Sequence, residues 1–145
     1  MRLTFHTDYA LRLLIYLAVR PDRLATIKEI SEAYDISRNH MMKVAHELGQ
    51  SGFLGTVRGR GGGLRLSRPP EEIGLGDVVR AMEEDFRIVE CFDRERNTCI
   101  ISGPCRLKGI LNESLQAWLA VLDRYTLKDL AQDPAPIGQI LGIPD

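Results

Sequence analysis

Apolar residues recur at intervals of three and four along the first part of the chain, which is the spacing of helices that bury one face. This pattern predicts helices over residues 7–20, 26–35, 37–51 and 76–83. Local chemistry sets their ends. Pro21 stops the first helix, Thr26 and Glu29 form a capping box for the second, and Ser37 caps the third.

Between the third and fourth helices the apolar spacing shortens to that of strands. Residues 53–57 and 64–67 are predicted to pair as a hairpin through the glycine-rich segment 58–63. Two helices, a tight turn at residues 35–36, a third helix and a hairpin follow the order of a winged helix-turn-helix. The predicted fold class is therefore mainly α, with a two-stranded β wing.

The remainder of the chain is organised around its cysteines. Residues 84–104 are polar and irregular, a long helix is predicted over 105–124, and Thr126 begins a short helix. Residues from Asp133 onward are expected to form a tail. We expect one domain, divided into a DNA-binding unit (1–83), a cysteine-bearing loop (84–104), the long helix (105–124) and a C-terminal segment (125–145).

Composition supports a folded protein without a membrane span. The 145 residues match one domain, and 44% apolar with 27% charged residues is typical of globular chains. The longest apolar run, residues 13–19, is far shorter than a membrane-spanning helix. Asp8 interrupts the stretch where a signal peptide is apolar. We therefore expect a cytoplasmic protein with reduced thiols.

The net charge of −1 conceals an asymmetry. Residues 1–68 contain 11 Lys and Arg against 6 Asp and Glu, whereas residues 69–145 contain 8 against 14. A basic first half favours a polyanionic partner. On charge alone, a basic face that is merely solvated is an equal alternative.

The third helix has the side chains of a DNA-reading helix. In a helix-turn-helix, its N-terminal residues meet the base edges of the major groove, while the start of the second helix crosses the phosphate backbone. Arginine suits guanine, asparagine suits adenine, and serine or lysine holds phosphate. The candidate DNA contacts are Thr26, Lys28, Ser37, Arg38, Asn39, His40 and Lys43. The alternative is that Thr26 and Ser37 only cap helices and the others are solvated.

The hairpin tip adds two further candidates, Arg58 and Arg60, which lie among four glycines. Glycine allows close approach to a sugar–phosphate surface, and arginine enters narrow minor grooves. A phosphate-binding P-loop is excluded because no Gly-Lys-Ser/Thr follows. A flexible turn without a ligand is the alternative.

All three cysteines, Cys91, Cys99 and Cys105, fall in one window. In a reducing compartment such a cluster indicates metal binding or redox sensing. The short Cys-x2-4-Cys chelate of zinc sites is missing, and three thiolates on a wide loop suit an iron–sulfur cluster better. Three ordinary thiols remain the alternative.

Six groups of segments, spread over nearly the whole chain, resemble the iron–sulfur winged-helix regulators, a family that includes nitric-oxide-sensing repressors and IscR. They are residues 1–4 with 7–12, 37–41, 57–59 with 62–63, 76–80, 104–107 and 125–130. The match to the nitric-oxide-sensing members is close.

This resemblance implies a homodimer joined through the long helix, with one cluster per subunit held by Cys91, Cys99 and Cys105. IscR-like members add a histidine after the last cysteine, where this chain has Lys108 and no later histidine. Nitric-oxide-sensing members instead use an aspartate from the first helix of the partner subunit, which matches Asp8. Three thiolates and one carboxylate favour [4Fe–4S], with [2Fe–2S] as the runner-up. The gap between Cys91 and Cys99 is longer than usual in the family, which leaves the path of the loop open.

The implied function is a repressor that binds double-stranded operator DNA. Nitric oxide would nitrosylate the cluster, release Asp8 to pair with Arg12, and so free the first helix and relieve repression of nitric-oxide detoxification genes. An IscR-like or redox-responsive regulator is the first alternative, and a small electron-transfer iron–sulfur protein is the second. No catalytic constellation is recognisable, so an enzyme is not expected.

Overall fold

The computed structural model describes all 145 residues and confirms a mainly helical chain with one two-stranded sheet. In chain order the elements are α1 (Phe5–Val19), α2 (Ile27–Tyr34), α3 (Arg38–Gln50), β1 (Leu54–Val57), β2 (Gly63–Leu66), η1 (Pro70–Glu72), α4 (Leu75–Met82), η2 (Glu90–Phe92), α5 (Arg106–Asp123), α6 (Leu127–Leu130) and α7 (Pro134–Leu141). None of these helices combines the length and apolar character that a membrane span requires.

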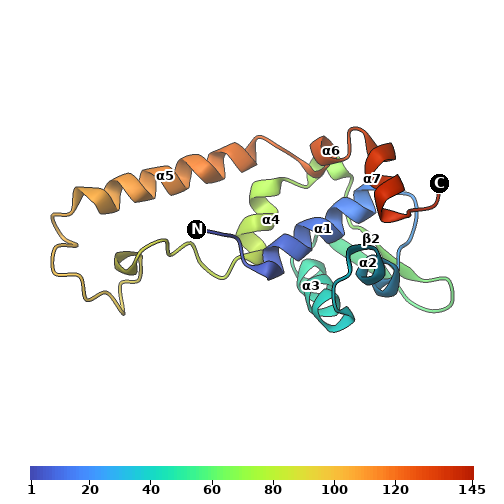
Figure 1. Cartoon of the computed structure of the whole chain (residues 1–145), viewed down its shortest axis with the longest axis horizontal. Helices are drawn as coiled ribbons and strands as arrows, with labels where there is room; N and C mark the ends of the chain where they lie inside the picture. The colour runs from blue at the N-terminus through green and yellow to red at the C-terminus, as the bar shows by residue number, and fades with distance from the viewer.

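Helix α1 is the centre of the main core. Leu13, Leu14 and Leu17 are almost completely buried, and α1 packs against α3, α4, α6, α7 and β2. Figure 1 shows α1 crossing the middle of the body, with α3 on one side and α6 and α7 on the other. Helix α1 therefore contacts both α3 and the hairpin directly.

The start of α1 differs from the prediction. The helix begins at Phe5 rather than Thr7, because the Thr4 hydroxyl accepts a hydrogen bond from the Thr7 backbone N–H and caps the helix. The capping box at Thr26 and the cap at Ser37 are confirmed.

The expectation of a C-terminal tail is wrong. Residues 134–141 form α7, which accepts Pro134 because the first turn of a helix needs no N–H donor there. Gly142 ends α7 in the left-handed conformation, at φ 63°. Gly138 and Ile143 are buried, and an added Cβ on Gly138 would lie 3.4 Å from Val19. Pro134 and Pro136 therefore lie in the first turn of a helix that covers the core at the C-terminal end of α1.

The hairpin is fixed to the body through the start of α2. Strands β1 and β2 pair antiparallel from Leu54 opposite Leu66 to Val57 opposite Gly63. Leu64 also exchanges backbone hydrogen bonds with Ala25, at 2.7 and 3.1 Å. Gly62 is required at the tip, because an added Cβ would lie 2.1 Å from the Val57 carbonyl oxygen.

Helix α5 packs on the body through a separate, smaller core. Leu115 and Leu119 are buried against Val79 of α4. Figure 1 shows the N-terminal half of α5 and the loop of residues 84–104 extending away from the other helices. This end of the molecule carries the cysteines.

Candidate nucleic-acid interface and cysteine loop

Helix α3 has one buried and one exposed face. The buried face consists of Met41, Val44, Ala45 and Leu48 and packs in the main core. The exposed face consists of Arg38, Asn39, Met42, Lys43 and His46. Sequence reasoning found the first two and Lys43, but it missed Met42 and His46. Helical spacing from Asn39, at three and seven residues, identifies both.

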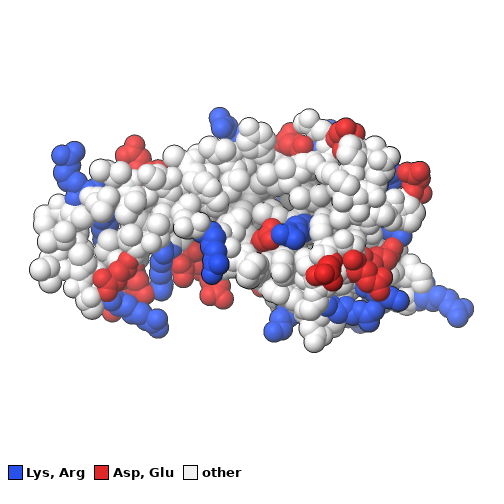
Figure 2. Space-filling model, in the orientation of Figure 1, with Lys and Arg blue, Asp and Glu red and all other residues white.

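The cations near this face are free of internal partners. Arg38, Lys43, Arg58 and Arg60 are exposed, and none forms an ion pair within the chain. Figure 2 shows lysine and arginine side chains along the edge of the molecule that carries α3 and the hairpin. Unpaired cations on one edge suit a polyanion, because phosphate contacts do not first require breaking an internal salt bridge.

The candidates at the start of α2 lie beside acidic neighbours. Thr26 caps α2 by accepting from the Glu29 N–H at 3.1 Å, while Glu29 accepts from the Thr26 N–H and from Arg23. Lys28 is exposed and lies 3.9 Å from Glu32. The Thr26 hydroxyl accepts from the Glu29 N–H, and its own proton can be donated either to the Glu29 carboxylate or to a phosphate oxygen.

His40 is the one candidate that faces the body. Its ring lies edge-on to Tyr9, with centroids 4.7 Å apart, and stacks on His6 at 6.1 Å. His6 also contacts α3 one heptad further on, where its Nε2 lies 2.6 Å from Glu47 Oε2. The first two turns of α1 are therefore attached to α3 at two points, through His40 and Glu47.

The hairpin presents its two candidate arginines at its tip. Arg58 and Arg60 are both exposed. Gly59, which lies between them, and Gly61, which follows Arg60, have positive φ angles of 96° and 75°. Only glycine adopts these angles without strain. Arg65 on β2 is also exposed and unpaired, and it belongs to the same acid-free stretch of sequence.

Asp8 lies on the first turns of α1 and is paired with Arg12. Arg12 Nη2 donates to Asp8 Oδ2 at 2.7 Å and Nε donates to Oδ1 at 3.2 Å. Both side chains are partly exposed. The Tyr34 hydroxyl donates to the Arg12 carbonyl at 2.9 Å, and burial raises the pKa of Tyr34 to about 12. The structure therefore pairs Asp8 with Arg12, on a helix that α2 also holds.

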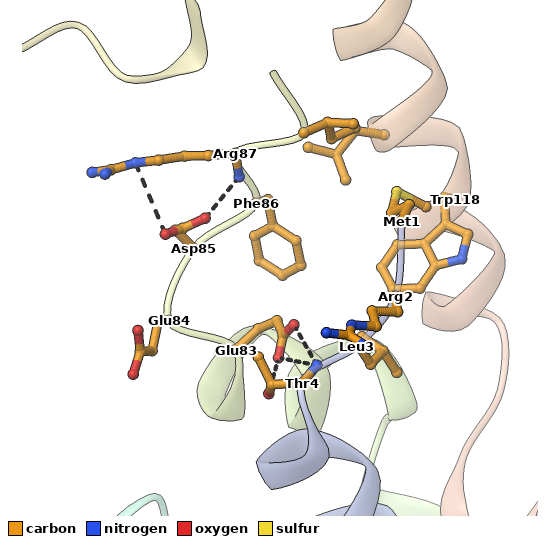
Figure 3. Close-up of a pocket in the computed structure, with 12 residues that line it drawn as sticks. Met1, Arg2, Leu3, Thr4, Glu83, Glu84, Asp85, Phe86, Arg87 and Trp118 are labelled. Atoms are coloured by element: carbon orange, nitrogen blue, oxygen red, sulfur yellow. Dashed lines mark hydrogen bonds and ion pairs between the residues drawn. The ribbon is translucent and has the colours of Figure 1, made fainter. Parts of the chain in front are cut away.

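The N-terminus of α1 is held by a carboxylate from the end of α4. Glu83 accepts hydrogen bonds from the Thr4 N–H at 3.0 Å, from the Thr4 hydroxyl at 2.7 Å and from the buried Thr7 hydroxyl. Burial alone would raise the pKa of Glu83, but the bonds from Thr7 and Thr4 outweigh it and lower that pKa. Figure 3 shows Glu83 beside Thr4 at one end of a cavity of about 390 Å³, with Trp118 and Phe86 on its other walls.

The three cysteines are free thiols at the far end of the molecule. Cys91 lies in η2 and Cys105 is the N-cap of α5, both half-buried, whereas Cys99 is exposed. No group of three or more His, Cys, Asp or Glu side chains converges closely enough to hold a metal ion. Hydrogen bonds within the loop join near neighbours, such as Thr98 to Glu90 and Asn97 to Ser102.

The donor chemistry of this loop fits an iron–sulfur cluster. None of the three thiols is tied up in a disulfide, and all lie within one segment. Cys105 stands at the positive end of the α5 dipole, which favours an anionic ligand there. Because these hydrogen bonds join residues of the loop to one another, the thiols can approach one another without breaking hydrogen bonds to the helical body. Asp8 lies apart on α1 and does not converge with the thiols within the chain.

Helix α5 exposes an apolar seam on the side away from α4. Leu107, Ile110 and Val121 are 59%, 53% and 44% exposed, and Ser114 and Ala117 lie between them. Their spacing of three and four residues places these five side chains on one stripe. The opposite stripe, with Leu115 and Leu119, is the one that packs on the body. The seam is a surface with no partner inside the chain.

Comparison with known proteins shows similarity along nearly the whole chain. Residues 3–133 match the Rrf2 family model, described as an iron-dependent transcriptional regulator. The chain is 56% identical over 142 residues to the HTH-type transcriptional regulator NsrR of Bacillus subtilis strain 168, which covers 97% of both chains. It is 53% identical over 131 residues to NsrR of Shouchella clausii, covering 90% of this chain and 88% of that one.

Solved structures share the fold. The oxidised form of CymR from Staphylococcus aureus aligns with a TM-score of 0.72 at 28% identity, over 90% of this chain and 96% of that one. IscR of T. potens aligns with a TM-score of 0.73 at 22% identity, over 92% and 88%.

Proposed function

Because this chain belongs to the Rrf2 family of transcriptional regulators, we propose that it is a DNA-binding repressor whose iron–sulfur cluster senses nitric oxide and thereby controls operator binding. It is a regulator and not an enzyme. The observation that carries the sensing part is that all its cysteines are free thiols in one segment. Together with the resemblance of the sequence to nitric-oxide-sensing repressors, this favours a cluster sensor.

DNA reading is assigned to α3 and the hairpin. Arg38 and Asn39 are exposed at the start of α3 and contact base edges, while Ser37 and Lys43 contact phosphates. Thr26 and Lys28 hold the backbone that α2 crosses. Arg58 and Arg60 enter the neighbouring minor groove. His40 is better suited to positioning α3 than to touching DNA, because its ring is packed on Tyr9.

The cofactor site is assigned to Cys91, Cys99 and Cys105 of one subunit and Asp8 of the partner subunit. When bound there, a cluster would supply irons able to react with nitric oxide. Three thiolates with one carboxylate suit [4Fe–4S], and [2Fe–2S] with the same ligands is the alternative. A carboxylate would be a weaker ligand for such iron than a thiolate, so Asp8 would be the most weakly held of the four proposed ligands.

Asp8 connects the site to α3 through α1. Iron binding at an Asp8 oxygen would draw electron density from the carboxylate and weaken its hydrogen bonds from Arg12, so the two partners would compete for Asp8. The choice between them acts on the turn of α1 that also carries His6 and Tyr9, the residues in contact with Glu47 and His40. A shift of this turn changes how α3 is held. A hundredfold loss of operator affinity requires only about 2.8 kcal/mol.

A homodimer completes the proposal. The apolar seam of α5 is suited to a second copy of the same helix, because Leu107, Ile110 and Val121 are exposed apolar side chains, while the opposite stripe with Leu115 and Leu119 is packed on the body. A two-fold axis at α5 also makes two reading helices available for half-sites about 34 Å apart.

The test is an anaerobic titration of the cluster-loaded protein with nitric oxide. Iron, acid-labile sulfide and the visible spectrum are followed together with binding to a palindromic operator. We expect cluster loss and operator release to proceed in parallel. Cys99→Ala should carry no stable cluster, and Asp8→Ala should keep the cluster but release DNA less sharply.

Two exposed residues outside the proposed ligand set supply controls. Arg94→Ala, in the same loop as Cys99, and Asp22→Ala, an exposed acid after α1, should behave as wild type. If Cys99→Ala binds operator and still responds to the gas, the sensor assignment is wrong. If Asp8→Ala responds normally, only the route through α1 is wrong.

A further inference from the structure

The reading face of α3 carries one large apolar side chain, Met42, whose role the assignments above do not explain. Met42 is 54% exposed, whereas its neighbour Met41 is fully buried. It lies three residues after Asn39 and four after Arg38, and therefore on the same side of the helix. The side chains around it on this face are polar or charged.

Packing within the chain does not account for Met42. It belongs to neither apolar cluster of the protein, and it is absent from the partly buried residues that pack against them. The exposed apolar seam of α5 lies on a different element. Met42 is thus an isolated apolar group in the middle of a surface that is otherwise suited to polar and anionic groups.

The major groove offers one apolar group, the C5-methyl of thymine. Arg38 and Asn39 supply the hydrogen bonds that select guanine and adenine, but neither selects thymine. The unbranched and flexible methionine side chain adapts its shape to a neighbouring apolar surface. Lys43 and His46 flank Met42 on the exposed face and can hold the phosphates on either side.

We propose that Met42 is a specificity-determining residue that contacts the C5-methyl of a thymine in each operator half-site. This inference rests on the proposed entry of α3 into the major groove, and it is independent of the cluster and of nitric oxide. It commits to thymine because an apolar contact gains nothing from the polar edge groups of the other bases.

The test isolates the methyl group. High-affinity duplexes are first selected from a random duplex library with the full-length, cluster-loaded dimer. Each thymine of a selected duplex is then replaced by uracil, which lacks only the methyl group. Burial of one methyl-sized group corresponds to about fourfold in affinity, so one thymine position should cost wild type about fourfold per half-site and about fifteenfold when both are replaced.

Met42→Ala should bind the thymine and uracil duplexes equally at that position, and it should match wild type on the uracil duplex. Met42→Leu should restore part of the discrimination, because it restores an apolar contact. Ile140→Ala, which removes an 85% exposed apolar side chain from α7, should keep the full wild-type preference for thymine.

Three outcomes would overturn the inference: uracil is tolerated at every position by wild type, Met42→Ala retains the same loss on uracil, or no sequence-selective duplex is recovered. The last would also contradict DNA reading by α3. A normal thymine preference in a protein that ignores nitric oxide would refute the sensor assignment and leave Met42 as assigned.

Discussion

The contact between His6 and Glu47 offers the sharpest test of how α1 positions the reading helix. The two residues are 41 positions apart in sequence, and His6 Nε2 lies 2.6 Å from Glu47 Oε2. Glu47 lies on α3, whose exposed face is assigned to DNA. Simple electrostatics predicts that Glu47→Ala tightens operator binding, because an acidic side chain near the phosphates is removed. Positioning predicts the reverse.

The structure bounds the size of the effect. The two side chains are 26% and 43% exposed, so the contact belongs with partly solvated polar contacts, which contribute about 0.2–1 kcal/mol. A dimer contains two such pairs. If each helps to hold α3 in register, Glu47→Ala should weaken operator binding by about twofold to thirtyfold.

The assay is operator affinity by fluorescence anisotropy for wild type, His6→Ala, Glu47→Ala and the double variant. Residues that act through one contact give non-additive changes, so the double variant should bind about as weakly as either single variant. Glu71→Ala, an exposed acid on η1, controls for removal of a charge. Tighter binding by Glu47→Ala, or strictly additive changes, would refute the positioning role.

Three further predictions concern the other contacts of α1 and the hairpin. Tyr34→Phe removes the hydrogen bond to the Arg12 carbonyl and should cost about 1 kcal/mol in urea unfolding, with loss of the tyrosine that titrates near pH 12 in ultraviolet spectra; unchanged stability would contradict the anchoring role. Glu83 has a lowered pKa in the folded protein, so its contribution is present above its ordinary value of 4.5 and is lost as pH falls through the folded value. Glu83→Gln, which weakens the bonds to Thr7, should therefore be less stable than wild type at neutral pH, and the difference should vanish in acid, as followed by thermal unfolding; a difference that does not depend on pH would contradict this. Arg60→Ala should weaken operator binding and reduce the slope of log affinity against log salt by about 1 per subunit, because an arginine in the minor groove also releases counterions; an unchanged slope would show that Arg60 does not contact the DNA.

Local patterns explain most of the agreement between sequence and structure. Capping by Thr26 and Ser37, the apolar spacing of α3 and α5, and the glycine-rich hairpin involve residues a few positions apart, and each was predicted to within one or two residues. The wrong prediction at α7 also came from a local pattern, the two prolines at residues 134 and 136. Prolines indicate a break in a helix, and only packing on α1 shows that they begin one.

The sequence by itself determined the element order, the family resemblance and the choice of the three cysteines as candidate cluster ligands, because these depend on residue type and spacing. Tertiary structure decided which side of α3 is free: it turns His40 toward Tyr9 and leaves Met42 and His46 in solvent. It also joined Glu83 to Thr4 across 79 positions. Such contacts arise when separate helices bury their apolar faces together, and the direction in which one helix packs on another is not written in the spacing of either.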